Sequence, residues 1–366
     1  MERFRAIFSD LPDPRDINAL HDLTEILFIA LLATLSGASG CAAIAEFGVA
    51  KEALLREILE LEHGIPSHDT FSRVFRMLDP AAFEQVFIRF MREFGEAAGI
   101  PAASGVVAFD GKSLRRAYEK GRAHMPPLMV SAWATNTRMV LAQTQAPNGN
   151  EVKGTLDLLK LLDLKGCIVT TDALHCHRQM AKDVRAAGAD YALKVKDNQP
   201  ALVAAAEAAL AAAGTRAKHA ETNDNDHGRI ERRRAIVVAA KDLAQKHKFE
   251  GLSAVGRIES WRTVNGRTST FVHLILLSKV MPPAELLETV REHWSIENRQ
   301  HWPLDVTFRE DDSRARKDNA PRNLAVLRRL SMNILRAHPA KSSMNLKRQH
   351  AGWNDRFLFE LLTHMR

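Results

Sequence analysis

Cysteine is scarce in this chain, which has only Cys41, Cys167 and Cys176 among its 366 residues. An odd and sparse count gives no disulfide framework and is typical of a reducing cytoplasm. The start, Met1-Glu2-Arg3-Phe4-Arg5, also lacks the basic-then-apolar order of a secretory signal peptide. We therefore expect a cytoplasmic protein.

Long uncharged runs are also rare, and one of them is compatible with either a membrane span or buried helices. Residues 26–45 carry no charge over about twenty positions, which is the length of a membrane span. Their middle, residues 34–40, reads Thr-Leu-Ser-Gly-Ala-Ser-Gly, which is turn-like and only weakly apolar. We expect a buried helix, a break and a second helix in this segment, and no membrane partner.

Several motifs with a defined chemistry are missing. The sequence has no Gly-rich phosphate-binding loop, no Gly-x-Ser-x-Gly nucleophile elbow and no paired-histidine metal motif. His175, Cys176 and His177 are adjacent, so they cannot all face one tetrahedral zinc ion without strain. These absences argue against a P-loop nucleotidase, a serine hydrolase of that type and a structural zinc site.

The charge balance is positive. The chain has 51 Lys and Arg against 44 Asp and Glu, a formal net charge of +7, and a pI of about 9.4. Hydrophobic residues make up 46% and charged residues 26%, as in ordinary globular proteins. The length allows two or three domains. The excess of basic residues favours a polyanionic partner such as nucleic acid.

The pattern divides the chain into three parts. Residues 1–98 predict an all-helical N-terminal domain, a candidate for binding DNA ends. Within it the break at residues 62–66 is compatible with a helix-turn-helix or with plain helix packing. Residues 101–340 predict a catalytic domain with a mostly β insertion at about 214–280, and residues 341–366 a C-terminal tail.

The order of elements in the second part indicates its fold. Three strands are predicted first, then a helix, a strand, a helix and a strand, at residues 106–109, 128–134, 139–144, 156–162, 168–172, 177–187 and 191–195. This order matches the α/β ribonuclease H-like fold, a mixed sheet flanked by helices in which the first and fourth strands are parallel neighbours. We expect a polar loop at 221–228 and a late helix, opened by Pro282 and Pro283, that carries Glu297.

Three acidic residues are candidate metal ligands. Asp110 and Asp172 each end an apolar strand, and acids at the carboxyl ends of strands lie at the sheet edge where sites form. With Glu297 they could form an all-oxygen site for two Mg²⁺ or Mn²⁺ ions. Such a pair of ions suits phosphodiester cleavage. Each aspartate taken alone is also compatible with a turn or a helix cap.

Basic and aromatic residues near these acids are candidate DNA contacts. The basic cluster at residues 229–234 is compatible with phosphate contact or with a solvated face, and Trp294 and Trp302 with base stacking or core packing. The candidate DNA contacts are Lys112, Arg115, Arg116, Arg229, Arg232, Arg233, Trp294, Arg299 and His301.

Ordered motifs along the chain resemble those of one family. They are Gly-Ile-Pro-Ser-His-Asp-Thr-Phe at 64–71, Phe-Asp-Gly-Lys-Ser-Leu-Arg at 109–115, Thr-Asp-Ala at 171–173, Asp-Tyr at 190–191, Lys-Asp-Asn-Gln at 196–199, His-Gly-Arg-Ile-Glu at 227–231, His-Trp-x-Ile-Glu-Asn at 293–298 and His-Trp-x-Leu-Asp-Val at 301–306. With these motifs the chain resembles the ISAs-type insertion-sequence transposases, or H-repeat-associated proteins, of the bacterial DDE class.

The resemblance implies a function and a site. It implies a ribonuclease H-like core, Mg²⁺-dependent cleavage at element ends followed by 3′-hydroxyl strand transfer, and Asp110, Asp172 and Glu297 as the catalytic triad. The implied partners are the terminal inverted repeats and target DNA, bound by a homo-oligomer, a dimer, at the bacterial nucleoid. The alternatives are a host nuclease of the same fold and a transposase-derived DNA-binding protein without catalysis.

The chain departs from the family pattern at three places. After the third strand the family has Lys-Ser-Asn-Glu, and here only Asn150 and Glu151 of that motif remain. After the second aspartate the family reads Ala-Met-Gly-Cys-Gln, whereas residues 173–177 read Ala-Leu-His-Cys-His. The tyrosine-arginine-glutamate-lysine signature around Glu297 is also poorly kept.

Overall fold

The N-terminal part of the chain is helical. The computed structural model describes residues 2–98, 105–117, 126–214, 217–226 and 229–362. The first six helices are α1 (Glu2–Phe8), α2 (Leu23–Leu35), α3 (Cys41–Ala50), α4 (Glu52–Leu55), α5 (His68–Met77) and α6 (Pro80–Ala97). Every residue of α2 is buried. The predicted helix, break and second helix across residues 26–45 are therefore confirmed, and no helix in the described ranges could cross a membrane.

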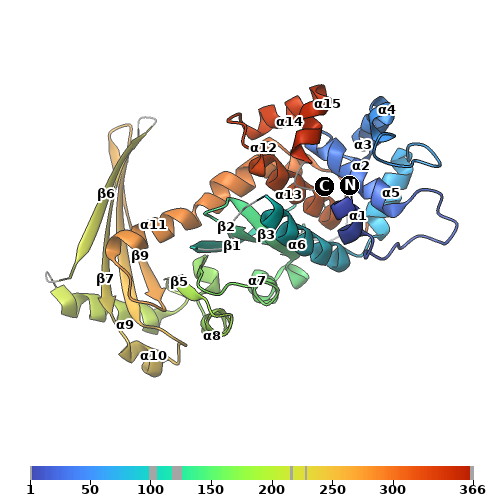
Figure 1. The fold of residues 1–366 in the computed structure, drawn as a ribbon. Coiled ribbons are helices and arrows are strands. Elements are labelled where there is room, and N and C mark those ends of the chain that lie inside the picture. Colours follow the sequence, from blue (N-terminus) through green and yellow to red (C-terminus); the bar gives the residue numbers. More distant parts are fainter. Residues whose placement is uncertain (1, 99–104, 118–125, 215–216, 227–228, 363–366) are drawn as a thin grey trace.

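The last helices of the chain complete this helical body. They are α13 (Ala320–Ala337), α14 (Met344–Trp353) and α15 (Asp355–Leu361). One hydrophobic core joins Phe4 and Phe28 from the first helices to Leu330 and Phe357 from the last ones. Figure 1 shows the blue and red helices gathered together on one side of the molecule.

A single mixed sheet of nine strands lies beside the helical body. Its strands are β1 (Val106–Ser113), β2 (Leu128–Ala134), β3 (Met139–Gln145), β4 (Ile168–Thr171), β5 (Asp190–Val195), β6 (His219–Asp226), β7 (Arg229–Ala239), β8 (Ala254–Val264) and β9 (Arg267–Leu277). Their order is β3-β2-β1-β4-β5-β9-β8-β7-β6. Strand β1 pairs in parallel with β4, and β4 with β5. The predicted ribonuclease H-like core with a β insertion is confirmed.

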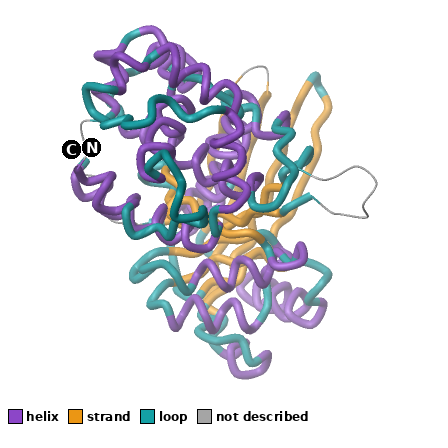
Figure 2. Tube along the Cα trace, turned by 90° about the vertical axis from the view of Figure 1, so that its right-hand side faces the viewer, coloured by secondary structure: helices purple, strands orange, loops and turns teal. Residues whose placement is uncertain are grey.

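Helices cover both faces of the core sheet. Ala108 and Trp133 belong to the core of the helical body, and α6 and α13 contact β3 on this side of the sheet. Val107 and Phe109, on the opposite face, pack in a second core with α7 (Glu151–Leu159), α8 (Arg178–Ala186) and α9 (Pro200–Ala213). Figure 2 shows the strands between these two groups of helices.

The insertion extends the core sheet. Residues 192–195 of β5 pair with 274–277 of β9, so strands β6 to β9 continue the core sheet as what we call the β extension. The extension also carries the short helix α10 (Asp242–His247). The expected polar loop is wrong for residues 221–226, which form most of β6 because they pair with β7. Residues 227–228 lie outside the described part of the chain.

The helix that was expected to carry Glu297 ends before it. Helix α11 (Pro283–His293) is followed by a π-helical turn, Glu297–His301, and then by α12 (Trp302–Val306). A π turn inserts an extra residue into a helix and is frequent at functional sites. Here it begins at Glu297 and ends at His301. Strand β1 likewise runs past Asp110 to Ser113, because its pairing with β2 continues to Leu128.

Candidate active site

The parallel pairing of β1 and β4 brings the two aspartates together. The register places Ala108 beside Thr170, so two residues further along each strand Asp110 lies beside Asp172. Asp110 remains within β1, opposite Ser131 of β2, while β4 has ended at Thr171. Neighbouring strands lie about 4.8 Å apart, so residues separated by 62 positions (172 − 110) become neighbours.

Asp110 is a largely buried carboxylate among other negative charges. Its side chain is 18% exposed, and its Oδ1 accepts a hydrogen bond of 2.9 Å from the Gly111 backbone N–H. Burial raises the pKa of Asp110 to about 7, and the charges of Asp172, Glu151 and Glu297 add to that rise. A carboxylate in such surroundings is stabilised when a cation binds beside it.

Asp172 has the opposite electrostatic surroundings. It is 58% exposed, and its Oδ1 lies 3.8 Å from His293 Nε2. The imidazole of His293, together with Lys194, keeps the pKa of Asp172 below its ordinary value against the opposing effect of burial. His293 Nδ1 in turn lies 3.0 Å from Thr170 Oγ1. His293 was not among the predicted site residues, although the His-Trp-x-Ile-Glu-Asn motif contains it.

The π turn supplies two further groups. Glu297 is exposed at its start, and its charge contributes to the raised pKa of Asp110. His301, one of the predicted DNA contacts, places Nδ1 3.6 Å from Asp110 Oδ2 and is 15% exposed. Burial, with the nearby charges of Arg329 and Lys112, lowers the pKa of His301 to about 3, so its imidazole is neutral at pH 7.

The donor atoms suit Mg²⁺ or Mn²⁺, which prefer oxygen ligands. Besides burial, repulsion by the neighbouring carboxylates raises the pKa of Asp110, and a divalent cation would relieve this repulsion. Within the described residues, however, no three His, Cys, Asp or Glu side chains surround one point closely enough to hold an ion. Asp172 is turned toward His293, so joint ligation requires its side chain to rotate.

Lys112 lies in a buried ion-pair network, away from solvent. Its Nζ is 2.6 Å from Asp305 Oδ1 and 2.9 Å from Asp311 Oδ1, and the side chain is 7% exposed. Glu310, fully buried nearby, pairs with Arg329 at 2.9 Å. The network ties β1 to the segment after α12.

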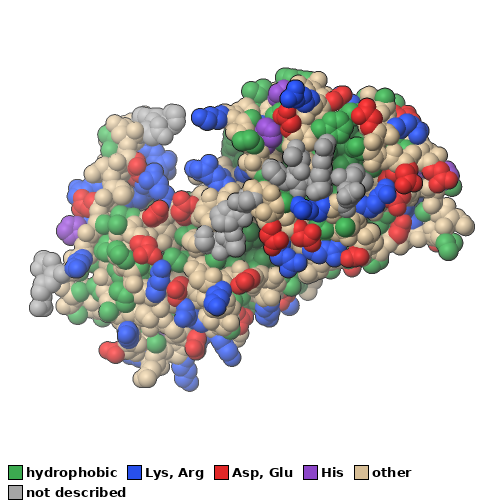
Figure 3. All heavy atoms as spheres, viewed as in Figure 1, with side chains coloured by type: hydrophobic (Ala, Val, Ile, Leu, Met, Phe, Trp, Pro, Cys, Tyr) green, Lys and Arg blue, Asp and Glu red, His purple; other side chains and the backbone are tan. Residues whose placement is uncertain are grey.

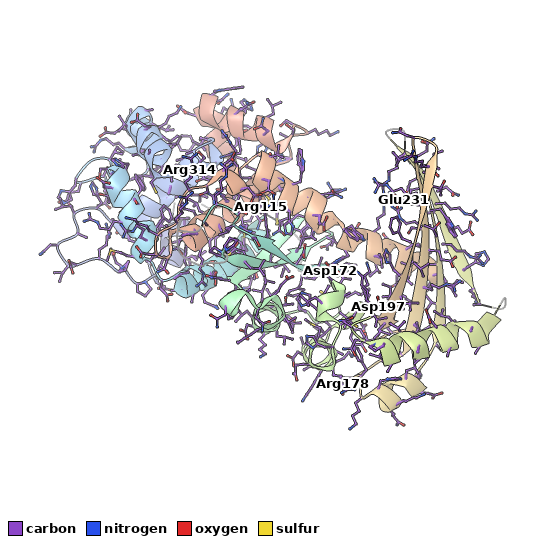
Figure 4. The ribbon with its side chains drawn as sticks, turned by 180° about the vertical axis from the view of Figure 1, so that it is seen from behind. Arg115, Asp172, Arg178, Asp197, Glu231 and Arg314 are labelled. Atoms are coloured by element: carbon purple, nitrogen blue, oxygen red, sulfur yellow. The ribbon has the colours of Figure 1, made fainter. Side chains whose placement is uncertain are left out.

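Arg115 and Arg116, the other two basic residues after Asp110, are exposed. Arg115 lies 3.3 Å from Asp311 and Arg116 3.4 Å from Asp312. Their guanidinium groups are therefore accessible to a polyanion while paired with an acid. Figure 4 places Arg115 beside the helical body, some way from Asp172.

The arginines on the β extension form a separate group. Arg229 and Arg233 pair with Glu231, and Arg232 pairs with Glu221 at 2.8 Å and lies over the ring of Trp261. Figure 4 shows Glu231 on the long strands, away from Asp172. Figure 3 shows a notch between the β extension and the helical body, with Lys and Arg side chains along its sides.

Trp294 and Arg299 lie between these groups, on the helical segment that connects α11 to α12. Trp294 is 43% exposed, and Lys194 Nζ lies 5.9 Å from the centre of its ring. Trp294 also lines a small pocket together with Asp172 and His293. Arg299 is exposed on the π turn. The predicted DNA contacts thus occupy three places on the molecule.

Both the N-terminal helical part and the part that contains the sheet match known protein families in sequence. Residues 101–334 match the transposase DDE domain, and residues 5–91 match the domain associated with it. The H repeat-associated putative transposase YhhI of Escherichia coli strain K12 is 31% identical over 366 aligned residues, which cover 97% of this chain and 96% of the relative. A protein from the dhlA 3′ region of Xanthobacter autotrophicus is 39% identical over 288 residues, covering 76% of this chain and 95% of that protein.

A solved structure also resembles the chain. The piggyBac transposase in a synaptic complex with hairpin DNA aligns with 99% of this chain and 81% of its own, at a TM-score of 0.44 and 11% identity. The family match rests on the sequence comparisons, which span the helical body and the sheet. This chain belongs to the transposase DDE domain family.

Proposed function

We propose that the chain is a DNA transposase of a bacterial insertion sequence. It hydrolyses one strand at each element end and then directs the freed 3′-hydroxyl to a phosphodiester of target DNA. The observation that carries this proposal is the parallel β1–β4 pairing, which brings Asp110 beside Asp172 at the sheet edge, together with the family match over residues 101–334.

Asp110, Asp172 and Glu297 would hold two Mg²⁺ or Mn²⁺ ions. Bound there, the ions would lower the pKa of the attacking water or hydroxyl and neutralise charge on the phosphate. Asp110 lies within β1, and its carboxylate accepts a hydrogen bond from the Gly111 N–H. Asp172 Oδ1 lies 3.8 Å from His293 Nε2, and the Asp172 side chain would rotate out of this contact to reach the ions.

The exposed basic residues would bind the DNA on either side of the acids. Arg115, Arg116 and Arg299 lie on the side of the helical body and the π turn, and Arg232 lies on the β extension. Phosphate contacts from several such groups give the steep salt dependence typical of DNA binding. Two copies of the chain, one at each element end, would make the working complex.

The decisive experiment is the substitution Asp110→Asn in the full chain. With a DNA duplex that carries the inverted repeat flanking the gene, we expect Mg²⁺-dependent cleavage to fall by roughly 10²–10³-fold or more. DNA binding should be retained, because Asn keeps the size of the side chain. The matched control is Asp157→Asn on α7, since the Asp157 side chain is 41% exposed and pairs with Lys153 at 2.7 Å.

Three outcomes separate the readings. Full cleavage by the Asp110→Asn variant would contradict the role of Asp110. Binding without cleavage by the parent chain would instead support a DNA-binding protein that has lost catalysis. Cleavage without strand transfer, from a gene that lacks flanking inverted repeats, would support a host nuclease.

A further inference from the structure

A fourth carboxylate packs against the backbone beside Asp110. Glu151 is the first residue of α7, where the Asn150 side chain accepts a hydrogen bond from the Lys153 N–H at 3.0 Å. An ideal Cβ built on Gly111 would lie 2.7 Å from Glu151 Cδ and 2.9 Å from its Oε1. The Glu151 carboxylate therefore occupies the space that a side chain at position 111 would fill.

A buried histidine holds Glu151 in that position. His175 Nε2 lies 3.2 Å from Glu151 Oε1, and the histidine side chain is fully buried. With the carboxylate ionised, a hydrogen bond in this contact needs the proton on Nε2, because an ionised carboxylate only accepts hydrogen bonds. His175 belongs to the short 3-10 turn directly after Asp172. The segment that carries the second aspartate thus also fixes the orientation of Glu151.

Glu151 is not neutralised as an acid in a structural ion pair would be. Among the described residues, no Lys or Arg forms an ion pair with it, and its side-chain hydrogen-bond partner is His175. Lys153, one turn away, pairs with Asp157 at 2.7 Å instead. The charge of Glu151 acts on Asp110, and like charges held close together destabilise a protein unless a cation joins them.

We propose that Glu151 is a fourth acidic residue of the metal site, with His175 as its positioning residue and Gly111 leaving room for it. This inference rests on the proposed function. Four carboxylates, from Asp110, Glu151, Asp172 and Glu297, balance the four positive charges of two divalent ions. His175 keeps the Glu151 carboxylate facing β1 before any ion arrives, which reduces the ordering that metal binding requires.

The test is a Mn²⁺ titration of the full chain without DNA, followed by electron paramagnetic resonance of the free ion. We expect Glu151→Gln to weaken Mn²⁺ binding by about tenfold or more. Asp157→Asn, on the same helix but outside the site, should bind as the parent does. His175→Leu, which loses the hydrogen-bond donor, should weaken Mn²⁺ binding less than Glu151→Gln does. His175→Gln, which keeps an N–H donor, should retain most of the Mn²⁺ affinity of the parent.

Thermal unfolding in EDTA separates a metal ligand from a structural residue. If Glu151 serves the metal, Glu151→Gln removes one of several like charges and should leave the metal-free melting temperature unchanged or raise it. Unaltered Mn²⁺ affinity with a lower metal-free melting temperature would overturn the inference and assign Glu151 to a structural contact with His175.

The controls also separate this inference from the proposed function. If Asp110→Asn abolishes Mn²⁺ binding while Glu151→Gln does not change it, the proposed function stands and the inference fails. If the parent chain binds no Mn²⁺ and cleaves no DNA, both fail.

Discussion

At the scale of single residues, the site combines two carboxylates with contrasting surroundings. Asp110 is held inside β1 among negative charges, and Asp172 is at the end of β4 near His293 and Lys194. Proton loss is therefore easy at Asp172 and costly at Asp110. In the metal-free protein, the ionisation of Asp110 therefore lowers the free energy of unfolding as pH rises, and this loss of stability can be measured.

Asp110→Asn should stabilise the metal-free protein at high pH. The pKa of Asp110 is about 7 in the folded chain and roughly 3.9 in an unfolded one. Because the folded state keeps the proton longer, the free energy of unfolding falls as pH rises between these values. We expect the variant to exceed the parent by about 1–4 kcal/mol at pH 8.

The measurement is urea unfolding in EDTA at several pH values. Parent and variant should converge below about pH 3, where Asp110 is largely protonated in both states. If the Asp110→Asn variant is less stable than the parent at pH 8, burial and like charges do not raise the pKa of Asp110 as described. The Asp157→Asn control should show no such pH dependence.

At the scale of elements, α7 positions the acids through a close approach to the sheet. Gly154, one turn after Glu151, is buried, and a Cβ there would lie 3.0 Å from Ala146 Cα and 3.1 Å from Val130 Cγ2. The Ala146 backbone is itself fixed, because its N–H donates to the Leu128 carbonyl at 2.8 Å. Glycine at 154 therefore sets the distance between α7 and the sheet edge.

Gly154→Ala should destabilise the protein despite the better helix propensity of alanine. Alanine gains about 1 kcal/mol over glycine within a helix, while overpacking against a fixed backbone costs about 1–3 kcal/mol. We expect a net loss of about 1–2 kcal/mol in chemical denaturation. Lys153→Ala on the exposed face of α7 is the control and should change stability by less than about 0.5 kcal/mol. A gain in stability at Gly154→Ala would show that α7 can move away from the sheet.

At the scale of the whole molecule, one buried arginine joins three distant parts of the chain. Arg348 of α14 donates to the carbonyl of Thr34 at the end of α2, at 3.1 and 3.0 Å, and to the carbonyls of Ala38 and Thr307. Thr307 follows α12 directly, so the contact reaches the segment that carries the π turn. A cation at the end of α2 also suits the helix dipole.

Arg348→Met should destabilise the whole helical body. The change leaves buried carbonyls without a donor, and we expect a loss of about 2–4 kcal/mol in the free energy of unfolding. The matched control is Arg356→Met on α15, because Arg356 is 89% exposed and pairs with Glu360 in the same helix. Equal stability of the two variants would show that the carbonyls find other partners or water.

Much of the fold follows from local pattern. The apolar runs at 106–109 and 168–172 predicted β1 and β4, because burial and backbone propensity act over a few neighbouring residues. The polar segment 221–226 was missed as a strand, since its pairing with β7 decides its conformation. The π turn was missed because it depends on how the helix packs against neighbouring elements.

The sequence by itself determined the family, the order of the core strands and the candidate acids, because ordered motifs and apolar runs are local properties. Only the tertiary structure decided which groups meet. It placed Glu151 over Gly111 and His175 beside Glu151, and it buried Lys112 in an ion-pair network. Side chains remote in sequence interact only through distance and burial, and those quantities exist only once the sheet and its helices have packed.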